Sequence, residues 1–239
     1  MLDMDNIEFD EIYNQTFSGL TLFYRDTTLA EDLILKYKAG QIIVERGFID
    51  MSFKGNGLET NLRYLIASSN ATDLSFFPES EKWGHILLPA KCFFKVLDIY
   101  KIGDKTQIFL LEIPASAVPF FANADTDIEE EIIEKARKSF EEKVNAIPIP
   151  ELQTPEWRKR TEFPIGMNDK GDFFNSAENP NQIETTISEI DDEQHKEEVY
   201  HNPADIENEM ESIYTEMANR QTVENQTPIQ KESPWWKFW

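Results

Sequence analysis

The stretch from Glu81 to Tyr100 constrains the fold of this 239-residue sequence more than any other part of the chain. It holds two short apolar runs, Ile86–Leu88 and Cys92–Leu97, on either side of Pro89. Such runs are too short and too rich in β-forming residues for helices, so they predict two consecutive strands that cross a core.

A further strand is predicted over Thr106–Ile113, directly after the turn signal Gly103-Asp104. The sequence therefore predicts a hairpin in this region. A group of polar and aromatic residues lies just before these strands: Glu79, Glu81, Trp83, Gly84 and His85. Functional side chains are expected where such residues lie at the end of a sheet.

The first half of the chain carries most of the other strand and helix signals. Strands are predicted over 20–24, 41–44, 47–53 and 62–67, with 41–44 and 47–53 expected to pair with each other. Capping-box patterns at 28–31 and 126–129 predict helices that run to Gly40 and to about Val144. Together these elements indicate an α+β fold with a mainly antiparallel sheet.

The charge of the chain argues against a nucleic-acid partner. Its formal net charge is −22, which leaves no excess of Lys and Arg for phosphate contacts. Residues 171–239 hold 16 acidic against 4 basic side chains, a net −12, so the C-terminal region carries more than half of the charge. A segment of this composition buries too little apolar surface to offset the entropy cost of ordering.

We therefore expect three regions. Residues 1–122 form the sheet domain, 123–170 supply a supporting helix and an irregular wrap over the fold, and 171–239 form an acidic, largely disordered tail. The basic run Arg158-Lys159-Arg160 lies in the wrap. Such a run more commonly consists of solvated surface charges, and a functional basic patch is the alternative interpretation.

The tail contains two candidate recognition elements. Residues 202–219 place Asn202-Pro203 before an apolar stripe at helical spacing, which predicts a short helix that folds on a protein partner or packs back on its own domain. The aromatic terminus Trp235–Trp239 predicts an anchor in a partner's pocket or at a membrane interface. We favour a protein partner, because the acidic tail opposes binding to an anionic membrane.

The single cysteine, Cys92, lies beside Phe93 and Phe94 and is expected to be a buried structural thiol. One cysteine excludes an internal disulfide framework and fits a reducing compartment. The acidic start of the chain lacks the pattern of a secretion signal, and no run reaches the length of a membrane span. We therefore expect a cytoplasmic protein without a transmembrane segment.

Three motifs follow one another along the first half of the chain: Phe23-Tyr24-Arg25, then Gly47-Phe48 with Asp50-Met51-Ser52, then His85–Pro89 with Phe94-Lys95-Val96. In this order, over about residues 20–113, they resemble the arginine/serine/glutamate class of mono-ADP-ribosyltransferases. The resemblance implies an α+β fold with a split, mainly antiparallel sheet and a few helices. It also implies NAD as substrate and no metal ion.

Roles for five residues follow from this resemblance. Arg25 would bind the pyrophosphate of NAD, since an arginine fork suits that group, and Ser52 would orient the cofactor. A fixed carboxylate would stabilise the oxocarbenium-like transition state. The two glutamate positions of the family motif fall on Trp83 and His85, while Glu79-Ser80-Glu81 has the Glu-x-Glu form four residues earlier. The candidates for the acid residue are thus Glu81, Glu79 and His85.

Taken singly, these residues also have structural interpretations. Arg25 fits an ion pair with its neighbour Asp26, and Ser52 fits an ordinary strand serine. The sequence thus leaves two functions open: an NAD-dependent mono-ADP-ribosyltransferase that acts on a protein, and an inactive ADP-ribosyltransferase-like adaptor that recruits a partner through its C-terminal elements. A neutral histidine in place of a glutamate supplies no fixed negative charge, which counts against the transferase.

Overall fold

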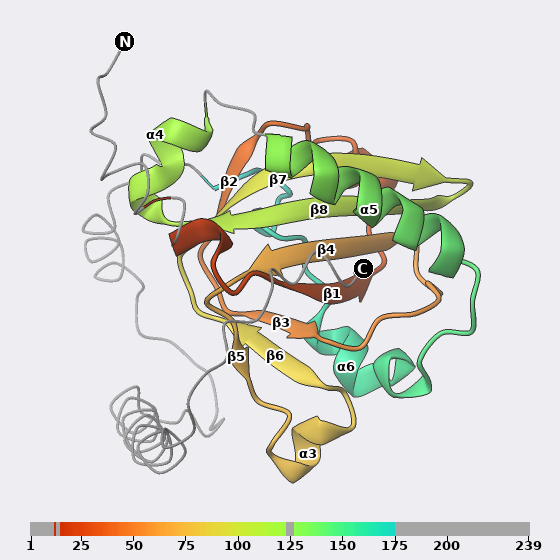
Figure 1. The fold of residues 1–239 in the computed structure, drawn as a ribbon. Coiled ribbons are helices and arrows are strands. Elements are labelled where there is room, and N and C mark those ends of the chain that lie inside the picture. Colours follow the sequence, from red (N-terminus) through yellow and green to blue (C-terminus); the bar gives the residue numbers. More distant parts are fainter. Residues whose placement is uncertain (1–11, 13–14, 123–126, 175–239) are drawn as a thin grey trace, which may run out of the picture. The chain divides into compact units, whose positions relative to one another are not determined.

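Eight strands of the computed structural model form one hydrogen-bonded sheet in the order β2-β7-β8-β4-β1-β3-β6-β5 (Figure 1). The structure describes residues 12, 15–122 and 127–174. The strands are β1 (Thr21–Thr27), β2 (Ile42–Glu45), β3 (Ile49–Ser52), β4 (Leu62–Ser68), β5 (Thr72–Asp73), β6 (His85–Leu88), β7 (Cys92–Ile102) and β8 (Lys105–Ile113). Among them β4 and β8 pair in parallel and the other neighbours pair antiparallel, so the predicted α+β, mainly antiparallel fold is confirmed.

The helices are short, with one exception. They are α2 (Glu31–Ile34), α3 (Pro78–Glu81), η1 (Ala115–Ala117), α4 (Val118–Phe121), α5 (Asp127–Lys143), η2 (Pro150–Gln153) and α6 (Pro155–Arg160). Within the described part of the chain, each helix is too short or too polar to cross a lipid bilayer. The predicted helix to Gly40 is only the single turn α2, whose N-cap residue Ala30 supplies no capping side chain.

Strand pairing confirms one sequence prediction and corrects another. The strands β7 and β8 form the predicted hairpin across Gly103. The strands β2 and β3, however, do not pair with each other: β2 pairs with β7, and β3 lies between β1 and β6. The prediction of a β2–β3 pair was wrong because apolar patterns identify strands without specifying which strands become neighbours.

A weak seam divides the sheet between β1 and β3. Only one residue pair, Tyr24 with Ser52, links these strands, whereas seven pairs link β1 to β4. Five strands therefore lie on one side of the seam and three on the other. This division corresponds to the split sheet that the resemblance implies.

Both faces of the sheet are covered. One face, here the core face, presents the side chains of the main hydrophobic cluster, including Phe23, Met51 and Tyr64. The opposite face, here the helix face, packs against α5, since the Gln107 side chain donates a hydrogen bond to the carbonyl of Ala136. Burial on both sides accounts for the fully buried central strand β4.

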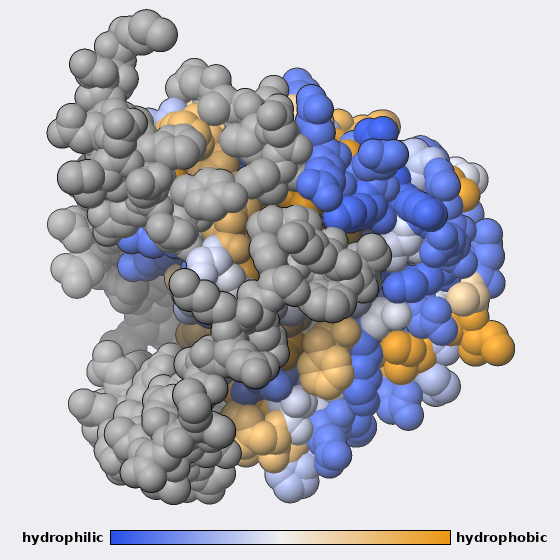
Figure 2. Space-filling model, in the orientation of Figure 1, coloured by the Kyte–Doolittle hydropathy of each residue, from blue (hydrophilic) through white to orange (hydrophobic). Residues whose placement is uncertain are grey.

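The helix α5 carries the apolar stripe that the sequence predicts. Ile132, Ala136 and Phe140 are buried, and Val144 just beyond the helix is buried too. The outward side of α5 is hydrophilic, as the view in Figure 2 shows. An ion pair of 2.9 Å between Lys95 and Glu129 adds a buried polar tie between β7 and this helix. The capping residue Thr126 lies outside the described residues.

Residues 149–167, here called the cover segment, pass from the helix face to the core face at the seam. On the helix face, Leu152 and Trp157 are buried in a cluster with Trp83. On the core face, Ile165 and Met167 join the main hydrophobic cluster. This segment includes η2 and the helix α6, which the sequence analysis did not predict. The predicted tail elements at 202–219 and Trp235–Trp239 lie outside the described residues.

The buried cysteine gives a direct test of this packing. The Cys92 thiol donates to the carbonyl of Pro89 at 3.0 Å, and burial together with the Glu112 carboxylate raises its pKa to about 12. Because the thiolate is the reactive form, native protein should react with a disulfide reagent such as DTNB at pH 8 far more slowly than protein unfolded in urea. Equal rates in the two states would contradict a buried thiol.

Candidate active site

Arg25 lies on the core face of β1 and is 5% exposed. Its guanidinium donates three hydrogen bonds to backbone carbonyls: to Asp50 at 2.9 Å, to Arg160 at 3.2 Å and to Phe163 at 3.1 Å. Burial lowers the pKa of Arg25 from its usual value. The side chain thus binds two carbonyls of the cover segment to the sheet, and Nε is the one guanidinium nitrogen without a hydrogen-bond partner among the described residues.

Two tyrosine hydroxyls extend this row of polar contacts along the core face: Tyr37 donates to the cover segment, and Tyr64 accepts from the Ile165 N–H at 3.3 Å. The Tyr37 hydroxyl donates to the carbonyl of Ile165 at 2.6 Å and lies 2.8 Å from the hydroxyl of Tyr64. Burial raises the pKa of Tyr64 to about 12 and that of Tyr37 well above its usual value, so both hydroxyls keep their protons at neutral pH. Arg25, Tyr37 and Tyr64 therefore direct their polar groups at the cover segment.

Ser52 and His85 lie on the other face of the sheet. Residues directly opposite in an antiparallel pair point to the same side, and successive residues alternate. Tyr24 pairs with Ser52, and Ser52 pairs with His85, so these three side chains share the helix face. Arg25, which follows Tyr24, points to the core face, and the sheet separates its guanidinium from the Ser52 hydroxyl.

The Ser52 hydroxyl is fully buried and bound by its own chain. Its Oγ donates to the carbonyl of Trp83 at 2.6 Å and accepts from the backbone N–H of Lys54 at 2.8 Å. These two bonds fix the segment before β6 against the end of β3. The geometry is that of a structural strand serine.

His85 is the centre of a buried polar network on the helix face. Its Nε2 lies 2.7 Å from Oδ1 of Asp50, and its Nδ1 lies 3.3 Å from the Ser80 hydroxyl. Arg160 contacts the same Asp50 oxygen at 3.5 Å. The carboxylate of Asp50 is thus shared between an imidazole and a guanidinium.

Two tryptophan rings pack near His85, Trp157 from the cover segment and Trp83 from the residues before β6. The Trp157 ring meets the His85 ring edge-on at 5.5 Å and lies 5.4 Å from the Trp83 ring. Trp157 is 2% exposed. Its helix begins with Thr154, whose side chain accepts a hydrogen bond from the Trp157 N–H, followed by Pro155 at the first helical position. This local signal holds the indole over His85.

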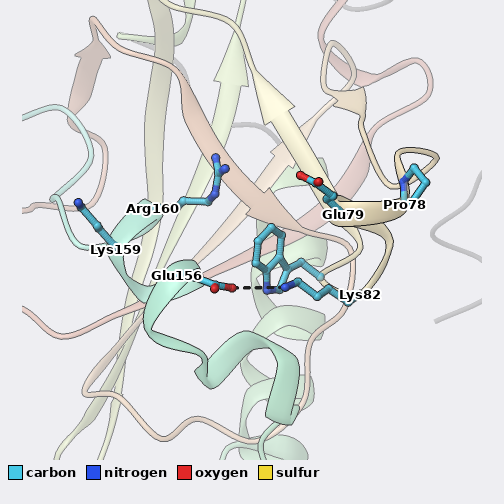
Figure 3. Close-up of a pocket in the computed structure, with 7 residues that line it drawn as sticks. Pro78, Glu79, Lys82, Glu156, Lys159 and Arg160 are labelled. Carbon is cyan, nitrogen blue, oxygen red and sulfur yellow. Dashed lines mark hydrogen bonds and ion pairs between the residues drawn. The ribbon is translucent and has the colours of Figure 1, made fainter. Parts of the chain in front are cut away.

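The two candidate glutamates lie apart from this network, on the exposed helix α3. Both Glu79 and Glu81 are exposed. Lys54 donates to the backbone carbonyls of Glu81 and Lys82, which fixes the end of α3 near β3. Of the two glutamates, Glu79 lines an open pocket between α3 and α6, where its carboxylate points across the opening toward the side that carries Arg160 (Figure 3).

This pocket has a volume of about 880 Å³, within the range of small-molecule sites. Its lining comes from two helices and the residues after α3: Pro78, Glu79, Lys82, Trp83, Glu156, Lys159 and Arg160. An ion pair of 3.3 Å joins Lys82 to Glu156 across it (Figure 3). Among the described residues, no group of three or more His, Cys, Asp and Glu side chains could hold a metal ion.

The structure therefore brings Ser52 and His85 together and separates both from Arg25, while Glu79 and Glu81 lie on α3. The sequence analysis missed three residues that complete the network, namely Asp50, Trp157 and Arg160. The Thr154-Pro155 pair, a capping residue before an N1 proline, was a signal for the helix that carries Trp157 and Arg160. The strand register that decides which residues share a face has no comparable signal in the sequence.

Comparison with known proteins gives partial structural likenesses. No family model and no curated protein matches the sequence. The ADP-ribosyltransferase HopU1 of Pseudomonas syringae pv. Tomato DC3000 matches at 19% identity with a TM-score of 0.36, over 39% of this chain and 46% of that chain. The ADP-ribosyltransferase Vis of Vibrio splendidus matches at 19% identity with a TM-score of 0.35, over 43% and 52%.

Exoenzyme S of Pseudomonas aeruginosa, in a complex with human 14-3-3 protein beta and carba-NAD, matches at 12% identity with a TM-score of 0.36, over 54% of this chain and 69% of that chain. The chain thus spans about half the length of HopU1 and Vis. HopU1 and Vis bear the name of the class that the sequence resembles. At this level of likeness, the chemistry of the chain has to be judged from its own residues.

Replacing Arg25 tests its structural role. The variant Arg25→Ala should lower the free energy of unfolding by at least about 2 kcal/mol, because it leaves buried carbonyls without donors. Arg158→Ala is the matched control: its side chain is 40% exposed and pairs with Glu59, so its loss should cost at most about 1 kcal/mol. Urea unfolding measures both, and equal losses would contradict the role assigned to Arg25.

Proposed function

We propose that this chain is an ADP-ribosyltransferase-like binding protein that recruits a protein partner and does not turn over NAD. The proposal rests on the groups that the Arg25 guanidinium already binds within the protein. Three of its N–H groups already bind the carbonyls of Asp50, Arg160 and Phe163. Arg25 is only 5% exposed, so its remaining N–H groups lie inside the fold and are not presented to a pyrophosphate as an open fork.

The acid position supports the same proposal. A transferase of this class needs a carboxylate fixed beside the reacting ribose, where it stabilises a developing positive charge. In this chain the matching position is His85, whose Nε2 lies 2.7 Å from the Asp50 carboxylate. Arg160 also contacts that carboxylate at 3.5 Å, so Asp50 already has two partners within the network.

The cover segment is also too firmly bound to open readily. A fully buried tryptophan removes up to about 250 Å² from water, which corresponds to roughly 4–6 kcal/mol. Trp157 is 2% exposed, and the hydrogen bonds of Arg25 and Tyr37 to the same segment would be lost with it. Opening would therefore cost several kcal/mol, so the closed form dominates the population.

Recruitment is assigned to the C-terminal elements of the sequence. Residues 202–219 have the apolar spacing of a helix that folds in a partner's groove, and Trp235–Trp239 bring four aromatic side chains to a short segment. Tryptophan is enriched among the residues that dominate binding energy at protein interfaces. The partner is thus a protein that offers an apolar groove or pocket.

A second candidate is the NAD-dependent mono-ADP-ribosyltransferase, with a protein as acceptor. The observation that favours it is the position of Glu79, a carboxylate at the edge of the pocket between α3 and α6. In that function Arg25 would bind NAD, Ser52 would orient it, and Glu79 or Glu81 would be the acid residue. NAD would be consumed as a substrate, its nicotinamide leaving as the ribose joins the acceptor.

Biotinylated NAD distinguishes the two candidates. Incubated with the full chain and a cell lysate, it should give no labelled protein and no release of nicotinamide, because neither the phosphate clamp nor the acid residue is available. Glu79→Gln and Glu81→Gln are tested in parallel as matched variants. Labelling that is lost in Glu79→Gln and kept in Glu81→Gln would reject the binding-protein proposal in favour of the transferase.

Removal of the aromatic terminus tests recruitment. Immobilised full chain should retain a partner from host lysate, and a variant without residues 233–239 should lose most of it, since anchoring aromatic residues dominate such interfaces. Lys237→Ala is the control within the same segment and should keep binding. Equal recovery of the partner by the full and shortened chains would count against recruitment through Trp235–Trp239.

A further inference from the structure

The pocket between α3 and α6 has a local charge that differs from the rest of the chain. The formal net charge of the protein is −22, yet three of the seven residues that line this pocket are cations, namely Lys82, Lys159 and Arg160. Two carboxylates, Glu79 and Glu156, also line it. The pocket thus carries a small net positive charge within a strongly acidic protein.

The indole of Trp83 supplies a second and independent feature. Trp83 lines the pocket and is 6% exposed. Its Nε1–H is buried and has no acceptor among the described residues. A buried donor without an acceptor costs about 1–3 kcal/mol. One residue of the pocket lining therefore carries a donor for which the described residues supply no acceptor.

The cations of the pocket are only weakly engaged by the protein. Lys82 and Glu156 are 3.3 Å apart with side chains 48% and 71% exposed, and such exposed pairs contribute little. Arg160 is 3.5 Å from Asp50, longer than a normal N–H···O hydrogen bond. Lys159 is exposed and forms no ion pair with a carboxylate of the described residues. All three can therefore turn to a ligand at small cost.

Two of these cations lie over the Trp83 ring. The Lys82 ammonium lies 4.3 Å and the Arg160 guanidinium 5.6 Å from the centre of the indole ring. Figure 3 shows Lys82 and Arg160 on opposite sides of the pocket, from α3 and α6. A compact ligand rich in acceptor oxygens fits this arrangement, because cations and a neutral donor then act on one group.

We propose that the pocket between α3 and α6 binds an oxyanion of the phosphate class. Lys82 and Arg160 supply charge-assisted hydrogen bonds, the Trp83 Nε1–H supplies a neutral one, and Lys159 adds charge at the rim. Glu79 and Glu156 oppose the anion and keep the affinity low. The site uses none of Arg25, Ser52 and His85, so it holds whether or not the chain turns over NAD.

The Trp83 indole N–H provides a direct readout in the ¹⁵N-labelled full chain. Its signal is assigned by its absence from the spectrum of Trp83→Phe. Inorganic phosphate and pyrophosphate should each move this signal downfield in a saturable way, as expected for a new hydrogen bond. Sodium chloride at matched ionic strength should not. ADP is titrated separately to distinguish a free phosphate from one carried by a nucleotide.

Matched variants test whether each charged side chain strengthens or weakens phosphate binding. Lys159→Ala and Arg160→Gln should each weaken phosphate binding about fivefold, the upper effect of an exposed charge pair. Glu79→Gln should strengthen binding by a similar factor, because it removes the opposing charge. Lys138→Ala, an exposed lysine on α5, is the control and should leave the affinity unchanged.

Two results would overturn the proposal. One is a Trp83 signal that responds to chloride as much as to phosphate at equal ionic strength. The other is a response to ADP without any response to phosphate or pyrophosphate, because recognition would then depend on the base. The amide spectrum of each variant, compared with that of the parent chain, verifies that the fold is kept.

Discussion

The attachment of the cover segment to the sheet depends on the buried positive charge of Arg25. A guanidinium that is removed from water must find acceptors inside the protein, and here three backbone carbonyls meet that need. Two of them belong to the cover segment, so the charge ties a distant part of the chain to the seam between β1 and β3. In the same segment, Trp157 packs against His85 and Arg160 lines the pocket between α3 and α6.

Most of the strands and the helix α5 follow from local sequence patterns. Short apolar runs marked β7 and β8, the turn at Gly103 joined them, and four-residue apolar steps marked α5. Pairing was harder, because β2 and β3 are neighbours in sequence but lie in different parts of the sheet. Strand identity is a local property, whereas the choice of partner depends on the packing of the whole sheet.

The candidate site was predictable only in part, for a related reason. The sequence identified Ser52 and His85, and the structure pairs them on adjacent strands. It grouped Arg25 with them, but a difference of one residue in strand register places a side chain on the opposite face. Trp157 was hidden in a proline-rich segment, where its burial depends on Trp83 and His85, which lie more than 70 residues earlier in the chain. Contacts over such sequence distances leave no periodic pattern.

The separation in sequence between Arg25 and its acceptors also bears on the order of folding. Its partners Arg160 and Phe163 lie 135 and 138 residues further along the chain. Contacts that close such long loops form late, because the loop entropy has to be overcome before they contribute. During synthesis the sheet can assemble while this cation still lacks its acceptors. Completion of the domain therefore waits for residues near 165, and a chain that ended earlier would leave the Arg25 guanidinium with only the Asp50 carbonyl of its three acceptors.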